Sequence, residues 1–312
     1  MAEHVSVLLN EAIEYLNINP SGIYVDLTLG RAGHSSEILK RLTKGGKLIG
    51  IDKDIEAINA SKDILSKIGN NFVVVKNDFR NFKEELHKLN IYSVDGILMD
   101  LGVSSPQFDC AERGFSYRES AKLDMRMDSS QSLTAYEVVN TYSLTDLARI
   151  FREYGEDKYA YQIAKRIVKV RENGPIVTTD NLVDLIKSVK PAKELAKKGH
   201  PAKQIFQALR IEVNDELGAL RDAIKDALEI LNKNGRLVII SFQSLEDRIV
   251  KNAFQEVAKK EGSRQNVWSL PSQEEEPSFR LVNNKVILPS EEEMNVNPRS
   301  KSAKMRVIEK IK

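Results

Sequence analysis

Two aspartates near the start of the chain belong to apolar runs, one inside its run and one at the end, close to where ligands meet parallel sheets. Asp26 lies inside the run Ile23–Leu29, which leads into the glycine-bearing turn Gly30–His34. Asp52 ends a second apolar run. Glycines let the backbone turn sharply and approach a ligand, and a carboxylate at position 52 can accept both hydroxyl groups of a ribose. The pattern predicts a nucleotide-type cofactor site at the carboxyl edge of a parallel sheet.

The spacing of the turn indicates which cofactor is bound. A dinucleotide site uses G-x-G-x-x-G, because a pyrophosphate must lie against bare backbone at a helix N-terminus. Here the spacing is G-x-x-G, with Arg31 and Ala32 between the glycines and Asp26 before them. Carboxylates are poor neighbours for a pyrophosphate but suit the ammonium, sulfonium and ribose of S-adenosylmethionine. We therefore expect S-adenosylmethionine; a strand–turn–helix whose glycines merely redirect the chain is the alternative.

Asp100 ends a further apolar run and is followed by small and turn-forming residues up to Gln107. Ligands and substrates meet at such strand ends, so Asp100 is a candidate catalytic residue beside the cofactor. An aspartate that caps a turn is the alternative. Phe79 follows another predicted strand, where it could stack on adenine or belong to the core. Gln107 could hydrogen-bond the cofactor or a base edge, or brace the loop.

Five apolar runs predict buried parallel strands, and helical patterns fall between the early ones. We expect strands at 23–28, 47–51, 72–75, 96–101 and 236–242, and helices at 35–42, 54–67 and 80–89. This βαβα alternation predicts an α/β fold, in which a doubly wound, mostly parallel sheet carries helices on both faces.

Strand patterns stop after Asp100 and helical patterns follow, at 133–140, 144–154, 157–172 and 179–189. An all-helical insertion into the sheet domain explains this break. We expect the first part of the sheet domain over 1–107, a helical substrate-recognition domain over 108–200, and the second part of the sheet domain over 201–312. Apolar residues spaced by three and four from Ile205 to Leu231 predict one long amphipathic helix that packs on the sheet and stops before Gly235.

Composition narrows the class of protein further. The chain has 312 residues, a net charge of +2 and one cysteine, Cys110, which excludes an internal disulfide and a cysteine-rich metal site. The histidines His4, His34, His87 and His200 lack metal-ligand spacing, so we expect no metal. No apolar run approaches the roughly 20 residues of a membrane span. The N-terminus has no signal-peptide pattern, and we expect a cytoplasmic location without membrane contact.

Two strings near Asp100 combine arginine with aromatic or apolar residues, at 112–117 and 123–128, and a third dense string follows the last predicted strand at 241–248. The first composition suits stacking of an unpaired base and binding of phosphates. A basic C-terminal tail from Asn297 to Arg306 could follow a phosphate backbone. Salt-bridged structure and a solvated terminus are the respective alternatives.

Six ordered motifs together resemble the bacterial ribosomal RNA small-subunit methyltransferase H family, also called MraW, from His4 to near the C-terminus. They are Gly30–Ser35, Asp100–Gln107, Glu112–Ser116, Leu123–Asp128, Ser244–Arg248 and Asn297–Arg299. The resemblance implies methylation of the exocyclic N4 of a cytidine in the decoding (P-site) region of small-subunit (16S) ribosomal RNA, with S-adenosylmethionine as donor. The implied partner is this rRNA or the 30S subunit. The resemblance leaves open whether the chain acts as a monomer or as a homodimer.

The resemblance also implies the residues of the site. Matched by motif, the cofactor contacts would be Ala32, Gly33, His34, Asp52, Phe79, Asp100 and Gln107. Asp100 would also accept an N–H of the cytosine amine during transfer. Two residues depart from the family's pattern: Ala32 replaces the first of two adjacent glycines, and Gln243 replaces a histidine before Ser-Leu-Glu-Asp-Arg. Glutamine and histidine can both hydrogen-bond, but a mechanism that needs an imidazole there is in doubt.

Three other functions compete with this one. A nicotinamide-dependent dehydrogenase would need a third glycine and a residue that handles a hydride, and neither is evident. An RNA-binding assembly factor with a vestigial pocket would not need the acids at 26, 52 and 100. A methyltransferase of small molecules or proteins would share the cofactor site, and the arginine–aromatic strings favour RNA over it.

Overall fold

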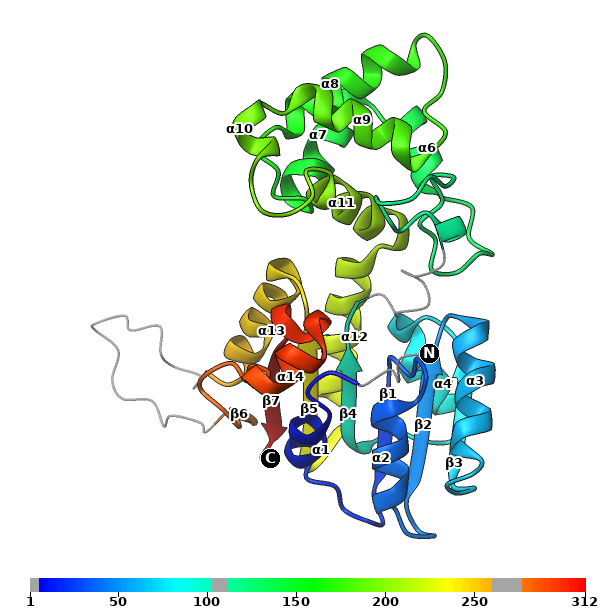
Figure 1. Cartoon of the computed structure of the whole chain (residues 1–312). Coiled ribbons are helices and arrows are strands. Elements are labelled where there is room, and N and C mark those ends of the chain that lie inside the picture. Colours follow the sequence, from blue (N-terminus) through cyan, green and yellow to red (C-terminus); the bar gives the residue numbers. More distant parts are fainter. Residues whose placement is uncertain (1–5, 103–110, 260–276) are drawn as a thin grey trace, which may run out of the picture. The chain divides into compact units, whose positions relative to one another are not determined.

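The computed structural model describes residues 6–102, 111–259 and 277–312. The chain forms two compact units, which we call the sheet unit and the helical unit (Figure 1). The sheet unit comprises Met1–Gly102 and Gly218–Lys312, and the helical unit comprises Val103–Leu217.

Within the described residues, the sheet unit contains a seven-stranded sheet of order β3-β2-β1-β4-β5-β7-β6. The strands are β1 (Ile23–Asp26), β2 (Lys47–Asp52), β3 (Phe72–Lys76), β4 (Val94–Asp100), β5 (Leu231–Ser241), β6 (Phe279–Leu281) and β7 (Lys304–Lys310). The pairs among β1 to β5 are parallel, and β7 is antiparallel to β5 and β6. The five predicted strands are all present, which confirms the mostly parallel sheet.

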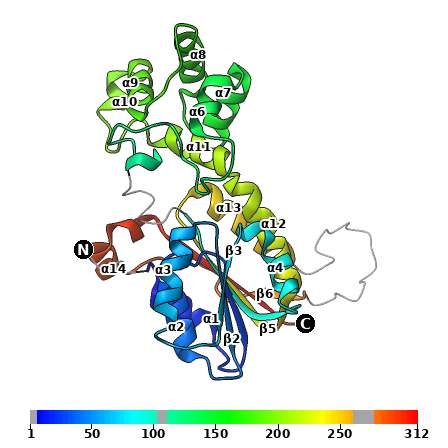
Figure 2. The ribbon, with the colours of Figure 1, turned by 90° about the vertical axis from the view of Figure 1, so that its right-hand side faces the viewer.

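Helices cover both faces of this sheet (Figure 2). One face packs against α1 (Leu9–Leu16), α2 (Gly33–Arg41) and α3 (Ile55–Leu65), and the other against α4 (Phe82–Lys88), α12 (Glu216–Ile230) and α13 (Ser244–Val257). Successive strand residues face opposite sides, so Leu98 contributes to the first core and Ile97 and Met99 to the second. Strands buried on both faces are apolar throughout, and this explains why the sequence shows continuous apolar runs.

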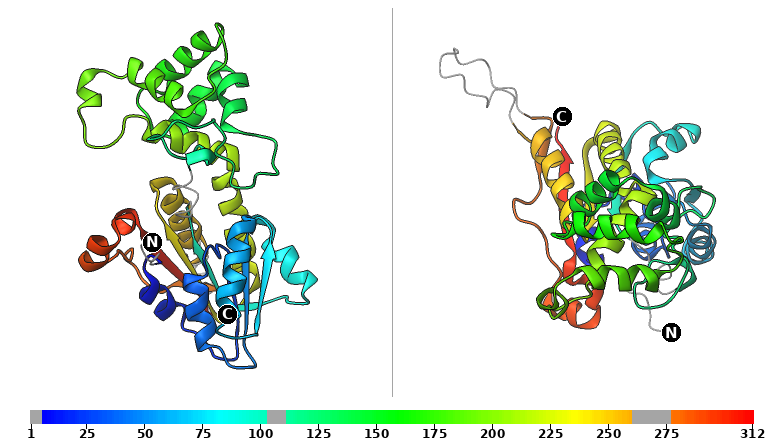
Figure 3. Two further views of the ribbon diagram at one scale, coloured as in Figure 1. Left: turned by 45° about the vertical axis from the view of Figure 1, so that its right-hand side comes forward. Right: turned by 90° about the horizontal axis from the view of Figure 1, so that it is seen from above.

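The helical unit is an insertion, as predicted. It contains α6 (Ala135–Thr141), α7 (Leu144–Glu153), α8 (Ala160–Arg171), α9 (Thr179–Val189), α10 (Ala192–Leu195) and α11 (Lys203–Asn214), packed together in Figure 3. A separate apolar core, with Phe151, Ile163 and Leu209 fully buried, holds these helices together.

The prediction of one long helix from 205 to 231 was wrong. Asp215 adopts a left-handed conformation with φ of 45° and separates α11 from α12. Leu209 of α11 belongs to the core of the helical unit, whereas Leu220 and Ile224 of α12 belong to the core of the sheet unit. The apolar stripe is therefore shared between two cores. The units divide after Leu217 rather than after residue 200, because α11 packs against α6 and α7.

The C-terminal residues are ordered structure rather than a free basic tail. After α14 (Glu291–Val296), the 3-10 helix η3 (Pro298–Ser302) leads into β7, which pairs with β5 and β6. Arg306 and Lys304 of β7 pair with Asp247 of α13, at N–O distances of 2.6 and 3.3 Å. These two cations are thus committed to the fold. Across the parts of the chain described, no helix is both long and apolar enough to cross a membrane.

Candidate active site

The strands of the sheet unit bring four carboxyl groups to one edge. Asp52, Asp26 and Asp100 are the last residues of β2, β1 and β4, which are neighbours in the sheet. Glu246 lies in the first turn of α13, after β5, which neighbours β4. Because these strands are parallel, their carboxyl ends meet at the edge where open α/β sheets bind ligands.

Asp52 is held by backbone N–H groups on both sides. Its Oδ2 accepts the N–H of Gly30 at 2.9 Å, and its Oδ1 accepts the N–H of Asp54 at 2.9 Å. One bond to each oxygen fixes the carboxylate and leaves further lone pairs on both. Asp52 can therefore accept two hydroxyl groups, as a ribose would require.

Asp26 is 2% exposed, and both its oxygens are used within the chain. Its Oδ2 accepts the hydroxyl of Ser35 at 2.7 Å, and its Oδ1 accepts the N–H of Thr28 at 3.1 Å. The residue ties the end of β1 to the first turn of α2. Its contribution at the edge is therefore its charge and the shape of the turn.

Asp100 is held through its backbone, and its carboxyl group faces His34. The hydroxyl of Thr28 accepts the N–H of Asp100 at 2.6 Å. His34 is 5% exposed; its Nε2 lies 3.1 Å from the carbonyl oxygen of Val7, and its Nδ1 lies 3.7 Å from Asp100 Oδ2. If Nε2 donates to Val7, a neutral imidazole presents the Nδ1 lone pair to Asp100. His34 thus connects the N-terminal segment to the candidate catalytic carboxyl.

Electrostatics at this edge disfavours negative charge. Burial raises the pKa of Asp26 and of Asp52 above the ordinary range. The pKa of Asp100 is raised well above it, first by burial and then by the charges of Asp26 and Glu246. Among the described residues, no lysine or arginine lies within ion-pair distance of Asp26, Asp52 or Asp100. An incoming cationic ligand would supply the missing countercharge.

The backbone conformation and the close packing of the turn between β1 and α2 explain why its residues are small. Gly30 has φ of 50°, a left-handed conformation that glycine adopts without steric cost. Gly33 has no room for a side chain, because a Cβ there would lie 1.9 Å from the hydroxyl of Ser6. Ala32 also has a positive φ, of 58°, and is fully buried. A glycine would adopt that conformation at lower steric cost than the alanine does.

Glu246 shapes the turn between β5 and α13. Its Oε2 accepts the N–H groups of Phe242 and Gln243, at 2.9 and 3.1 Å, and its side chain is buried. Gln243 is the N-cap residue of α13, with its side chain directed at the backbone N–H of Glu246; its Oε1 is buried and makes no hydrogen bond of normal distance and angle to a described residue. In the sequence, Glu246 stands out only as part of a dense string; its spacing of three residues after Gln243 is the helix-start signal that could have identified it.

The remaining predicted contacts are less fully placed. Phe79 begins the 3-10 helix η1 (Phe79–Asn81) after β3 and is half-buried against the core. Gln107, His4 and Cys110 lie outside the described residues. Thr28 was not singled out from the sequence, although its position two residues after Asp26 places its hydroxyl at the same edge.

In the helical unit, the arginine–aromatic strings serve the fold. Arg113 donates to the carbonyl oxygens of Arg126 and Met127, both at 3.0 Å, and Phe115 is buried. Arg126 binds both oxygens of Asp124 at 2.7–2.8 Å. Of the two alternatives left open by the sequence, salt-bridged structure therefore holds for these residues.

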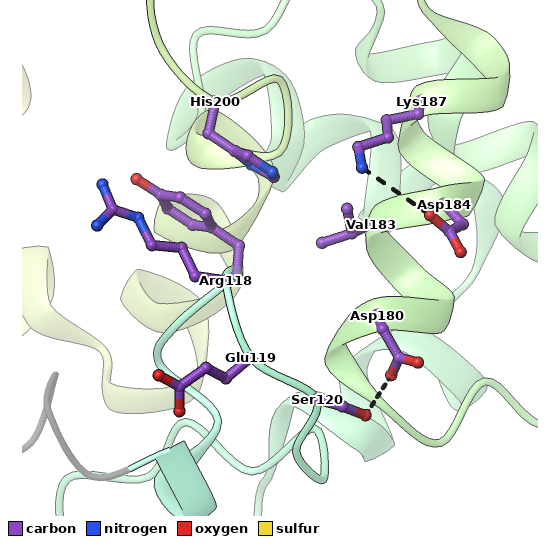
Figure 4. A pocket seen from close by; sticks show the side chains of 9 residues that line it. Arg118, Glu119, Ser120, Asp180, Val183, Asp184, Lys187 and His200 are labelled. Atoms are coloured by element: carbon purple, nitrogen blue, oxygen red, sulfur yellow. Dashed lines mark hydrogen bonds and ion pairs between the residues drawn. The ribbon is translucent and has the colours of Figure 1, made fainter.

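A cavity of about 310 Å³ lies elsewhere in the helical unit (Figure 4). Tyr117 stacks on His200 with ring centroids 4.3 Å apart, and burial lowers the pKa of His200. Arg118 lies on one side of the cavity and Lys187 on the other, with Lys187 Nζ 4.0 Å from Asp184. Glu119 and Asp180 line the cavity as well. In the described part of the chain, no group of three or more His, Cys, Asp or Glu residues could hold a metal ion.

A mostly parallel sheet of this order, with carboxylates at its edge beside a glycine turn, is a Rossmann-like, doubly wound α/β fold with a ligand-binding edge. The chain belongs to the MraW methylase family, whose model matches residues 1–311. The resemblance seen in the six motifs is thereby confirmed.

Two relatives that are similar in sequence over their whole length agree with this assignment. The ribosomal RNA small subunit methyltransferase H of Clostridioides difficile strain 630 is 53% identical over 308 residues, which cover 99% of each chain. The protein of that name from Streptococcus pyogenes serotype M4 is 52% identical over 313 residues, covering 99% of this chain and 98% of the relative. Among solved structures, a SAM-dependent O-methyltransferase of Thermotoga maritima aligns with a TM-score of 0.42 at 9% identity, covering 100% of this chain and 69% of that one.

Proposed function

We propose that this protein transfers a methyl group from S-adenosylmethionine to the exocyclic N4 of a cytidine in the decoding (P-site) region of 16S ribosomal RNA. The observation that carries the proposal is the set of three aspartates at the sheet edge that have no lysine or arginine partner among the described residues, in a chain of the MraW family. The relatives named as methyltransferases of small-subunit rRNA support the substrate.

The residues of the edge fit S-adenosylmethionine. Asp52 has lone pairs for two ribose hydroxyls, and the half-buried Gly30 and Gly33 put no side chain in the turn beside it. The ammonium and sulfonium would lie in the negative field of Asp26 and Asp100. We propose Ala32, Gly33, His34, Asp52, Phe79, Asp100 and Gln107 as the cofactor contacts.

S-adenosylmethionine supplies an electrophilic methyl group on a sulfonium. The cytosine amine is a weak nucleophile because its lone pair is delocalised into the ring, so the protein must orient the amine and localise that pair. Asp100 does both when it accepts an N–H of the amine, and orientation can contribute roughly 7–11 kcal/mol. Thr28 fixes the Asp100 backbone, and Asp100 takes the proton that the nitrogen releases.

The helical unit is proposed as the substrate-recognition part. Its support is the cavity in which Arg118 lies beside the Tyr117–His200 stack; Lys187 also lines it, with its Nζ 4.0 Å from Asp184. Cations bind phosphates, and aromatic faces stack on unpaired bases.

The test is methyl transfer to small ribosomal subunits from cells that lack this protein, followed by mass mapping of the modified nucleosides. We expect one N4-methylated cytidine in the decoding region. Methylation of another atom or another RNA would refute the proposed substrate. Absence of any transfer would favour the alternative of an RNA-binding assembly factor with a vestigial pocket.

Thermal stabilisation separates the proposed enzyme from a dehydrogenase. S-adenosylmethionine and its demethylated product should raise the melting temperature, because both bind the folded state alone. NAD should leave it unchanged; the opposite result would overturn the cofactor assignment.

A further inference from the structure

Two buried acceptor atoms at the carboxyl edge have no hydrogen-bond partner among the residues that the structure describes. They are Oδ1 of Asp100, at the end of β4, and Oε1 of Gln243, in the turn after β5. Buried polar atoms in proteins are nearly always paired. Two unpaired acceptors at one edge therefore indicate a ligand with donors.

The fold brings these two residues to neighbouring positions. Asp100 pairs with Ile240 of β5, and the next N–H, of Leu101, donates to the Ile240 carbonyl at 2.9 Å. Beyond the strands, a Cβ on Gly102 would lie 3.5 Å from the ring of Phe242, the residue before Gln243. The chain segments that follow β4 and β5 are thus in contact.

Glu246 interacts with both residues, with Gln243 through a hydrogen bond and with Asp100 through its charge. It accepts the N–H of Gln243 at 3.1 Å, and its charge is close enough to act on Asp100. The backbone of Gln243 is fixed by this bond at the same edge of the sheet as the candidate catalytic carboxyl.

We infer that Gln243 is a positioning residue that, together with Asp100, accepts the two N–H groups of the methyl-accepting amine. The inference rests on the proposed function and deepens it, because it assigns the site to a primary exocyclic amine. An acceptor on each N–H holds the amine in one orientation and concentrates electron density on the nitrogen. A hydroxyl, a thiol or a ring nitrogen offers at most one such donor.

The arrangement also limits the reaction to one methyl group. During transfer the nitrogen lone pair forms the new N–C bond, the pair of the broken S–C bond stays on sulfur, and one N–H proton passes to Asp100. The product keeps one N–H and can satisfy one of the two acceptors. It therefore binds less well than the substrate, and a second methylation is disfavoured.

The test compares Gln243→Met and Gln243→Ala, which remove the acceptor, with Gln243→His, which restores one. Asn283→Leu is the matched control, because Asn283 Oδ1 is also buried without a partner among the described residues but follows β6, beyond β7 from the site. Steady-state methylation of small subunits, S-adenosylmethionine affinity and the ratio of mono- to dimethylated cytidine are measured.

We expect Gln243→Met and Gln243→Ala to lower kcat/KM for RNA about tenfold or more, with cofactor affinity unchanged and the dimethylated fraction raised. Gln243→His should restore kcat/KM and single methylation, and Asn283→Leu should match the parent protein. Parent-like kcat/KM and product ratio in both acceptor-free variants would overturn the inference, as would loss of cofactor binding in both, which would mark a structural role. If the parent protein itself methylates no cytidine amine, the proposed function fails first.

Discussion

Ala32 holds a backbone conformation that favours glycine, at the start of the helix that follows the cofactor turn. Its φ is 58°, and it is fully buried. A residue with a Cβ costs roughly 1–2 kcal/mol in this left-handed conformation. Glycine avoids that cost, but its greater freedom in the unfolded chain offsets part of the gain in stability.

We expect Ala32→Gly to raise the free energy of unfolding by about 0.5–1 kcal/mol in urea titrations. Gly30→Ala is the matched control and should lower it, because Gly30 has φ of 50°. A loss of stability in Ala32→Gly would show that the surrounding chain, and not the conformation, determines the residue.

Asp100 carries a charge that its surroundings disfavour, and this predicts opposite effects on activity and stability. Asp100→Asn cannot take up the proton, so methyl transfer should fall roughly 10²–10⁴-fold. The same change removes a carboxylate destabilised by burial, Asp26 and Glu246, so the free energy of unfolding at pH 8 should rise.

The pH dependence of that stability follows from the raised pKa. The folded chain binds the Asp100 proton more tightly than the unfolded chain does. The contribution of protonated Asp100 to the free energy of unfolding is therefore fully present below about pH 4, the ordinary range of aspartate. It is lost as pH rises through the folded-state pKa. The advantage of Asp100→Asn should therefore vanish near pH 4, and a constant difference from pH 4 to pH 8 would contradict the assigned cause.

At the scale of elements, Asn214 ties α11 to the irregular segment before α6. Its Oδ1 accepts the N–H of Met127 at 2.8 Å, and its Nδ2 donates to the carbonyls of Met125 and Arg210 at 2.8 and 2.9 Å. The side chain is buried, so truncation would leave these groups without partners or water.

Asn214→Ala should therefore lower the stability of the helical unit by about 2–3 kcal/mol, as measured by circular dichroism during urea unfolding. Asn181→Ala, at an exposed position of α9, should change it by less than about 0.5 kcal/mol. Equal effects of the two substitutions would argue against the hydrogen-bond account.

The cavity in the helical unit predicts a salt-dependent loss of RNA binding. Removing Arg118 and Lys187 together should weaken binding and reduce the slope of log K against log salt by roughly 1.4–1.8. Lys193→Ala and Lys198→Ala, at exposed positions outside the cavity, form the control pair. An unchanged slope in the first pair would place the phosphate contacts elsewhere.

At the scale of the whole molecule, the carboxyl groups at the ends of neighbouring strands act together on a bound cation. The raised pKa values of Asp26, Asp52 and Asp100 mean that a cation gains most when the groups are ionised. Affinity for S-adenosylmethionine should therefore fall as pH is lowered from 8 to 5, and binding at intermediate pH should release protons.

Calorimetry in two buffers of different ionisation enthalpy would count these protons. Methylthioadenosine, which lacks the ammonium and the sulfonium charge, should show a weaker pH dependence. The same dependence for both ligands would mean that the charges of the cofactor do not interact with this edge.

Several features could be predicted from local sequence because local residues produce them. The apolar runs of β1 to β5 must be buried on both faces, and the acids that close them must lie at one edge of a parallel sheet. Asp52 and Asp100 were found in this way, whereas Asp26 was expected inside its strand and the structure ends β1 at it. The six ordered motifs by themselves indicated the MraW family. The helices α6 to α9 follow from their own periodic patterns.

Tertiary structure alone decided which side chains are free to act. Asp26 accepts hydrogen bonds from Ser35 and Thr28, and Arg113 and Arg126 bind carbonyl oxygens within the helical unit. Asp100 and Gln243 instead keep acceptor atoms that no described residue pairs. The break between α11 and α12 at Asp215 and the position of β7 between β5 and β6 likewise depend on cores assembled from distant segments. A spacing of residues determines where a group lies along its own element, but its partners, burial and pKa depend on chain that is far away in sequence.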